Sequence, residues 1–293
     1  MRANAVEVSA EAAWFLAETL GAGSYPWVLA ITPPYTDHAH RAEFEAGQVE
    51  RLTRLGVLGP DGAVDASVAR WIRSVCRPAQ WLELRFVGRD GSLLRGLVAR
   101  NGTATVVALR SAEMVTLTEM DLDHPQALVP VLTVGLSGRA PARFDEFAMP
   151  ADTGARADEQ IRNGASIRDM LDFLGIPSNA RPVVVAAFDE PRTYVEIVAG
   201  QHRDGHRVST DVGVSVVDTT GGRVLVSPTK APDGEWISTF APGTPPAIAS
   251  AVERLCAALP DGPWFPDHAV TRAFDEHTAE RRRQKEEPCQ STL

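Results

Sequence analysis

The chain has few cysteines, and their spacing provides no redox or metal-binding motif. Cys76, Cys256 and Cys289 are the only three, and no two of them form a CxxC pair. Cys76 and Cys256 lie in apolar stretches with helical periodicity, so we interpret them as small buried hydrophobic residues. Three scattered cysteines favour a reducing compartment over a disulfide-stabilised secreted domain.

Long apolar runs and an excess of positive charge are also missing. No window of 18 apolar residues occurs, which predicts that nothing inserts into a membrane. Glu7, Glu11 and Glu18 interrupt the N-terminal region, which therefore lacks the pattern of a signal peptide. The formal net charge is -9 and the sequence pI is about 5.3, so the chain should repel the phosphate backbone of nucleic acids. These features predict a cytoplasmic protein that binds neither nucleic acid nor membrane.

The sequence motifs of common catalytic sites are absent as well. There is no GxSxG, no HExxH and no phosphate-binding loop with GK followed by Ser or Thr. His38 with His40, and His202 with His206, each stand near an aspartate, but neither set reaches the four ligands of a structural metal site. We therefore predict no catalytic residue, no metal and no cofactor. A binding protein is the favoured interpretation, and an enzyme with an unrecognised site is the alternative.

What is present is an ordinary globular composition, with 44% hydrophobic and 23% charged residues among 293. Helical periodicity predicts helices over about residues 9–20, 39–55 and 68–76, with a short strand at 27–31 after the first. The period then changes to two, which predicts a meander of strands at 81–87, 93–99, 103–109 and 114–118. A helix opened by Pro125 follows.

The second part of the chain repeats this order of elements. A strand at 144–149 and helical segments to about residue 188 precede strands at 193–198, 208–217, 223–227 and 235–240. A final helix follows, capped by Thr244. Leu55-Gly56-Val57 corresponds to Leu174-Gly175-Ile176 with an offset of 174 − 55 = 119, and Pro125 corresponds to Pro245 with an offset of 245 − 125 = 120. The near-constant offset indicates an internal duplication.

The duplicated pattern predicts an α+β fold. We expect one antiparallel sheet, built from two similar meander halves with approximate twofold symmetry and flanked by helical bundles. The N-terminal half should span residues 1–140 and the C-terminal half residues 141–274. Residues 275–293 are highly charged, and we predict a disordered tail there.

Several short blocks of sequence resemble the EspG family of type VII (ESX) secretion. They are WFLAET (14–19), PWVL (26–29), RLGVL (54–58), ARFDEF (142–147), GARADE (154–159), YVEIVAG (194–200), GRVLVSP (222–228), GEW (234–236) and FAPGT (240–244). The likeness covers residues 3 to about 274, and in detail it is closest to the family member of the third ESX system.

This resemblance implies a cytosolic chaperone of PE–PPE heterodimers. Such a chaperone would bind the tip of the PPE subunit, keep it soluble and direct the dimer to the ESX secretion machinery. The resemblance also implies a quasi-symmetric sheet with helical bundles, and neither catalysis nor a cofactor. A homodimer whose exposed sheet pairs with itself is a further alternative, so self-association stays open.

The resemblance implies a binding surface on the sheet and helical bundle of the C-terminal half. Strand alternation turns the valines at 212, 214 and 216 inward, and the residues between them outward. Leu225 should share an outward face with Ser227 and Thr229, as a possible apolar anchor. The predicted partner-binding residues are Asp211, Gly213, Ser215, Leu225, Ser227, Thr229, Lys230 and Trp236. A buried Trp236 and a merely solvated Asp211 are the alternative interpretation.

Overall fold

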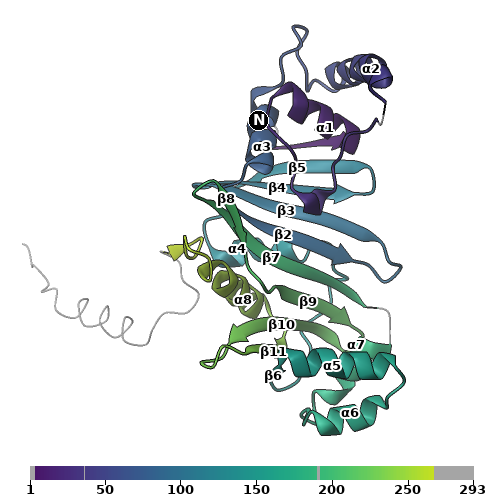
Figure 1. The fold of residues 1–293 in the computed structure, drawn as a ribbon, viewed down its shortest axis with the longest axis vertical. Coiled ribbons are helices and arrows are strands. Elements are labelled where there is room, and N and C mark those ends of the chain that lie inside the picture. Colours follow the sequence, from purple (N-terminus) through teal and green to yellow (C-terminus); the bar gives the residue numbers. More distant parts are fainter. Residues whose placement is uncertain (1–3, 36, 190–191, 267–293) are drawn as a thin grey trace, which may run out of the picture.

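A single antiparallel sheet forms the centre of the protein in a computed structural model, which describes residues 4–35, 37–189 and 192–266 (Figure 1). Its strands follow the order β1-β5-β4-β3-β2-β7-β9-β10-β11-β6, and β8 pairs with β7 beside this path. Helices cover the sheet, so the predicted α+β fold is confirmed. The predicted tail at residues 275–293 lies outside the described residues.

In the described part of the chain, five strands and the helices α1–α3 come before α4 (Pro125–Leu132). The strands are β1 (Ala5–Ser9), β2 (Gln80–Val87), β3 (Leu93–Asn101), β4 (Ala104–Ser111) and β5 (Met114–Met120). The helices are α1 (Ala10–Thr19), α2 (Arg41–Arg54) and α3 (Ala66–Cys76), with 3₁₀ helices η1 (Trp27–Leu29) and η2 (His38–His40) between α1 and α2. From the centre of the sheet outwards, the strands run β2, β3, β4, β5 and β1.

The remaining strands come from the second part of the chain. Its strands are β6 (Phe147–Pro150), β7 (Thr193–Arg203), β8 (His206–Ser209), β9 (Val214–Thr219), β10 (Gly222–Lys230) and β11 (Trp236–Pro242). Its helices α5 (Ala151–Arg162), α6 (Ile167–Phe173) and α7 (Arg181–Asp189) stand between β6 and β7 in the chain. From the centre outwards, the main strands run β7, β9, β10, β11 and β6, which matches the order in the first half. The duplication, its half boundaries and the twofold symmetry stay predictions.

The two faces of the sheet carry different sets of helices. On β2, Trp81 packs into the core under α1–α3, whereas Leu82 and Leu84 pack into the core under α4 (Pro125–Leu132) and α8 (Pro245–Ala257). Figure 1 shows α1–α3 and α5–α7 at opposite ends of the sheet, with α4 and α8 beside its centre. Since α4 and α8 also contact each other, they join the two halves on their face of the sheet.

Two predicted strands differ in the structure. Residues 27–31 form the turn of η1, because Ala30 adopts a left-handed φ of 49° and its carbonyl bonds to Arg110, so the prediction of a strand is wrong there. The predicted strand at 208–217 is divided into β8 and β9, which pair one after the other with the long strand β7. The break falls at Gly213, where a Cβ atom would lie 2.7 Å from the carbonyl oxygen of Ile197.

Candidate partner-binding grooves

An apolar groove lies between α7 and the strands of the C-terminal half. We call it the helix–sheet groove; its volume is about 350 Å³. It is lined by Phe144, Phe147, Asp158, Ala180, Val183, Val184, Ala187, Arg192, Tyr194, Glu196, Ser215, Val217, Thr219, Val224, Val226 and Phe240. Its floor comes from four adjacent strands, β7, β9, β10 and β11, and its wall from α7 and the segment leading into β6.

Short apolar side chains make up much of the lining. Val183 and Ala187 come from α7, and Val217 and Val226 come from the sheet. The buried clusters under α5–α7 are small: among the described residues, one has the buried members Met149, Leu171, Ile176 and Ala180, and the other has Ala142, Val183 and Val224. Unfilled apolar space with an opening to solvent is a site that an apolar side chain of a partner can occupy.

Aromatic rings close one side of the groove. The ring centroids of Phe147 and Phe240 are 4.8 Å apart with an interplanar angle of 4°, and Phe144 lies 6.1 Å from Phe147. The other side is polar: Arg192 lies 5.9 Å from the ring of Tyr194, and Glu196 forms an ion pair of 3.0 Å with Arg85 of β2. The groove therefore suits a partner segment with an apolar centre and polar groups at one end.

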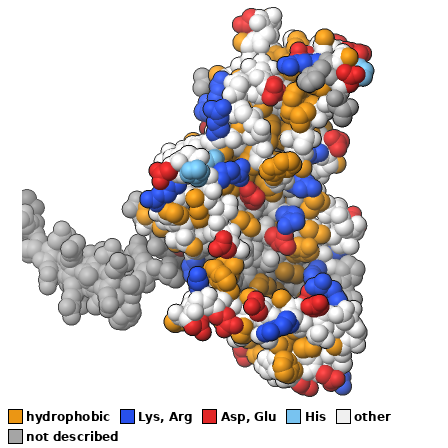
Figure 2. Space-filling model, in the orientation of Figure 1, with side chains coloured by type: hydrophobic (Ala, Val, Ile, Leu, Met, Phe, Trp, Pro, Cys, Tyr) orange, Lys and Arg blue, Asp and Glu red, His pale blue; other side chains and the backbone are white. Residues whose placement is uncertain are grey.

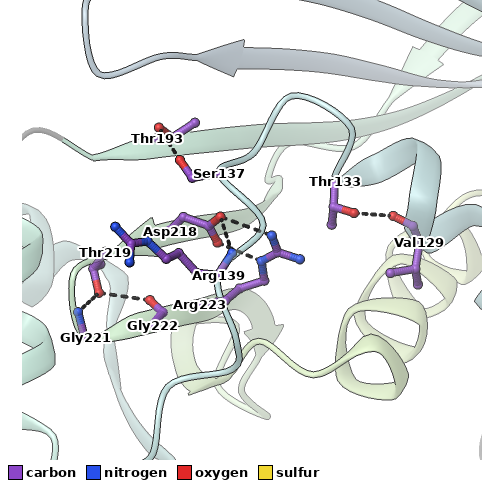
Figure 3. Close-up of polar contacts among 10 residues, drawn as sticks. All are labelled: Val129, Thr133, Ser137, Arg139, Thr193, Asp218, Thr219, Gly221, Gly222 and Arg223. Atoms are coloured by element: carbon purple, nitrogen blue, oxygen red, sulfur yellow. Dashed lines mark hydrogen bonds and ion pairs between the residues drawn. The ribbon is translucent and has the colours of Figure 1, made fainter.

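On the opposite face of the sheet, a buried ion pair holds the β9–β10 turn in place beside the groove (Figure 3). The guanidinium of Arg223 donates to both carboxylate oxygens of Asp218, at 2.7 and 3.1 Å, and only 1% of the Asp218 side chain is exposed. The backbone N–H of Arg139 donates to the same carboxylate at 3.3 Å, and Ser137 bonds to Thr193 at 3.1 Å. Residues 137–142, which connect the two halves, are thereby held against this turn.

A second groove, of about 460 Å³, runs along α8 at the end of β10 and β11. Its lining includes Val212, Arg254 and Leu255 as well as four residues predicted from the sequence. The ammonium of Lys230 lies 5.5 Å from the ring centroid of Trp236, which is half-buried. This lining mixes charged, polar and apolar groups, as the lining of the helix–sheet groove does.

The structure does not bring the predicted site residues together in one place. Asp211, Thr229, Lys230 and Trp236 line the second groove, and Ser215 lies on the floor of the helix–sheet groove. Gly213 is exposed in the break between β8 and β9. The prediction that Leu225 and Ser227 face outward is wrong: they are 2% and 5% exposed, and Leu225 belongs to the core under α8.

Sequence reasoning missed the helix–sheet groove itself. The valines at 224 and 226 line it, whereas strand alternation alone placed them opposite the outward face. The register pairs Val226 with Ser215 and Leu225 with Val216, so the outward residue of β9 shares its face with Val226 and not with Leu225. Alternation could not have shown this, because the register between the two strands was unknown.

Within the described ranges, no helix is long and apolar enough to cross a bilayer. Nor do three His, Cys, Asp or Glu side chains come together as a metal site there.

Comparison with known proteins defines the class of this fold. The model of the EspG family matches residues 9–254, and this chain belongs to that family. It is 65% identical over 282 residues to the ESX-3 secretion-associated protein EspG3 of Mycolicibacterium smegmatis, covering 96% of both chains. It is 56% identical to the protein of the same name from Mycobacterium tuberculosis, covering 94% of this chain and 98% of that one.

Other family members are more distant. The ESX-1 secretion-associated protein EspG1 of Mycobacterium tuberculosis is 32% identical, with 92% of each chain covered. The predicted likeness to the member of the third ESX system is therefore confirmed. The fold also matches the Mycobacterium tuberculosis type VII secretion system chaperone EspG5, solved in complex with a PE25–PPE41 dimer. The TM-score is 0.75 at 19% identity, over 89% of this chain and 99% of that one.

Proposed function

We propose that this chain is a cytoplasmic chaperone of type VII secretion that binds a PE–PPE heterodimer. It contacts the PPE subunit at its tip, keeps that tip soluble and directs the dimer to the ESX machinery. The observation that carries the proposal is the helix–sheet groove, an unfilled apolar site on four strands and a helix. The names of the relatives, and the dimer bound to EspG5, support the choice of partner.

An exposed apolar tip on a secreted dimer promotes aggregation. Burying that tip in a groove of this kind prevents it. Val217, Val224 and Val226 provide the apolar floor, and Phe240 provides a flat aromatic side. Glu196 and Arg192 at the polar end fix the orientation of the bound segment. The proposed chaperone role consists of binding and releasing the dimer, so it involves no cofactor and no catalytic residue.

The second groove is the competing location for the partner. It contains most of the exposed residues predicted from the sequence, Asp211, Thr229, Lys230 and Trp236. We assign the PPE tip to the helix–sheet groove because four strands and α7 line it and the stacked rings of Phe147 and Phe240 form one side of it. Substitutions in each groove separate the two locations.

The proposal is tested by co-expressing this chain with PE–PPE pairs from the same secretion locus and measuring the mass of the complex by size-exclusion chromatography with light scattering. We expect one species with one copy of each of three chains. If every folded pair runs apart from this chain at high micromolar concentration, the proposal is wrong. A mass of two copies of this chain alone, unchanged by any pair, would instead support the homodimer.

A further inference from the structure

Trp27 is the most exposed large hydrophobic side chain in the described parts of the chain, with 85% of its surface open to solvent. It lies in η1, which contacts β3 and β2. Single exposed apolar residues are common, so exposure alone carries no function. The way in which the structure holds this residue in place is more informative.

The turn that carries Trp27 is fixed from both sides. Leu29 is fully buried and Ile31 is 8% exposed in the core beneath α1 and α3, and the hydroxyl of buried Tyr25 donates to the carbonyl of Ala13 at 3.1 Å. Trp27 stands between these anchors on a short helical turn. Its backbone is therefore ordered before any partner arrives.

Two arginines of the sheet complete the support by bonding to the carbonyls of η1. Arg110 of β4 donates to the carbonyl of Leu29 at 3.1 Å and also to that of Ala30, and Arg95 of β3 lies 3.5 Å from the carbonyl of Val28. Ala30 ends the turn in the left-handed region with φ of 49°, which is unfavourable for a residue with a Cβ. Strain of this kind persists where the surrounding structure enforces it, and it is enriched at binding sites.

Trp27 and the helix–sheet groove lie on the same face of the sheet. The register connects them through one row of cross-strand neighbours, which share a face. The row consists of Arg110, Arg95, Arg85, Glu196, Ser215, Val226, Phe240 and Phe147. Its first two members hold η1 and its last five line the groove. Arg85 lies between these groups and pairs with Glu196; their side chains are 60% and 42% exposed, so this stretch of the sheet is uncovered.

Figure 2 views this face. Hydrophobic, basic and acidic side chains are interspersed on it in the region between the two groups of helices.

We propose that Trp27 is a second anchor of the partner-docking surface, which thus extends from the helix–sheet groove across β7 and β2 to η1. The occupant is the same PE–PPE heterodimer, so this inference rests on the proposed function. A preordered exposed tryptophan is the residue type most often found at energetic centres of protein interfaces, because it buries a large area at little cost in side-chain entropy.

The dimensions support one partner that covers both places. A stable protein interface buries about 800 Å² on each side, which corresponds to a patch roughly 30 Å across. Strands β3, β2, β7 and β9 are consecutive neighbours, so η1 on β3 and the groove floor on β9 are three strand spacings, or roughly 14 Å, apart. A partner seated in the groove with an interface of ordinary size therefore reaches Trp27.

The test compares Trp27→Ala with Leu55→Ala in binding to a PE–PPE dimer that forms a complex with the wild-type chain. Leu55 is a matched control, since it is a large apolar residue, 58% exposed, that follows α2 at the outer end of the N-terminal half (Figure 1). We expect Trp27→Ala to raise Kd at least tenfold, mainly through faster dissociation, with an unchanged melting temperature. Leu55→Ala should stay within twofold of the wild type.

The outcomes distinguish this inference from the function on which it rests. If the wild type binds and both variants bind within twofold of it, Trp27 is no anchor, although the chaperone function stands. An equal loss of affinity in both variants also overturns the inference, because it shows no preference for η1. If the wild-type chain binds no PE–PPE dimer, the proposed function fails, and the anchor fails with it.

Discussion

The indole of Trp81 lies against Gly200, its cross-strand neighbour where β2 of the first half meets β7 of the second. A Cβ atom at position 200 would be only 2.3 Å from Cε2 of Trp81, which is fully buried. The guanidinium carbon of Arg207 lies 4.5 Å from the centroid of the same ring, and the ring of His202 lies 5.1 Å away. The junction between the halves thus depends on the absence of a side chain at Gly200.

We expect Gly200→Ala to destabilise the protein by about 1–3 kcal/mol, because Trp81 has to leave its position and the core around it is overpacked. Unfolding in urea, followed by circular dichroism, measures this loss. Gly47→Ala is the control: Gly47 lies in α2, where a Cβ atom would meet no neighbouring element within 4 Å, and alanine there should stabilise the helix by up to about 1 kcal/mol. Equal changes in the free energy of unfolding for the two substitutions would contradict the requirement for glycine beside Trp81.

The ion pair between Asp218 and Arg223 should be worth far more than an ion pair at the surface. Removing one partner leaves the other charge buried, so we expect Asp218→Ala to cost about 3–5 kcal/mol of unfolding free energy. Glu50→Ala removes the partner of Arg54 in an exposed ion pair of 2.6 Å and should have little effect. Denaturant unfolding measures the free energy of unfolding of both variants. Equal losses would show that the buried ion pair contributes no more to stability than the exposed one.

The stability of the fold should fall at high pH through its buried thiol. Burial raises the pKa of Cys256 to about 12, whereas an unfolded thiol has a pKa of about 8.5. The folded state therefore keeps the proton that the unfolded state loses, and the resulting stabilisation is full below about pH 8.5 and is lost as the pH rises towards 12.

The contribution of Cys256 is isolated by Cys256→Ala, which removes the thiol and leaves Cys76 in place. The free energy of unfolding of the wild type should decline between pH 8.5 and 10.5 faster than that of the variant, by at most about 1.4 kcal/mol per pH unit. Parallel declines would show that Cys256 is accessible to solvent in the folded state.

Local sequence signals predicted where several helices begin and end, because these positions depend on residues close by in the sequence. Gly56 and Gly175 both end helices with positive φ, 72° and 65°. The following residues, Val57 and Ile176, donate to carbonyls five positions earlier at 2.9 and 3.0 Å. The side chain of Thr244 accepts the N–H of Ala247 at the start of α8, as its capping role predicts. Such motifs are readable because each is complete within one helical turn.

Elements fixed by distant contacts were not predictable. Nothing near Trp27 in the sequence indicates that Arg95 and Arg110, from strands much later in the chain, hold this segment as a turn. Strand β1 was not predicted for a related reason, since its five residues are stabilised by pairing with β5. A short apolar segment has no preferred structure until its partner is known.

The candidate site was predicted only in part, because both faces of β10 are covered. Val224 and Val226 line the helix–sheet groove, whereas Leu225 packs in the core beneath α8. A strand that is apolar on both faces has no pattern to distinguish them. The choice of Leu225 as an exposed anchor was therefore not constrained by the sequence, and the register of the sheet decided against it.

The central claim is that the PE–PPE partner occupies the helix–sheet groove, and the affinity of two charge variants tests it most directly. Val226→Arg puts a cation on the apolar floor of this groove, and Lys230→Glu reverses a charge in the second groove. After circular dichroism confirms both folds, Kd for the PE–PPE dimer is measured by isothermal titration calorimetry. We predict that Val226→Arg weakens binding at least about 100-fold, on the scale of an interface hot spot, and that Lys230→Glu changes Kd less than about threefold. Unchanged binding by Val226→Arg, with a large loss in Lys230→Glu, would place the partner in the second groove and contradict this claim.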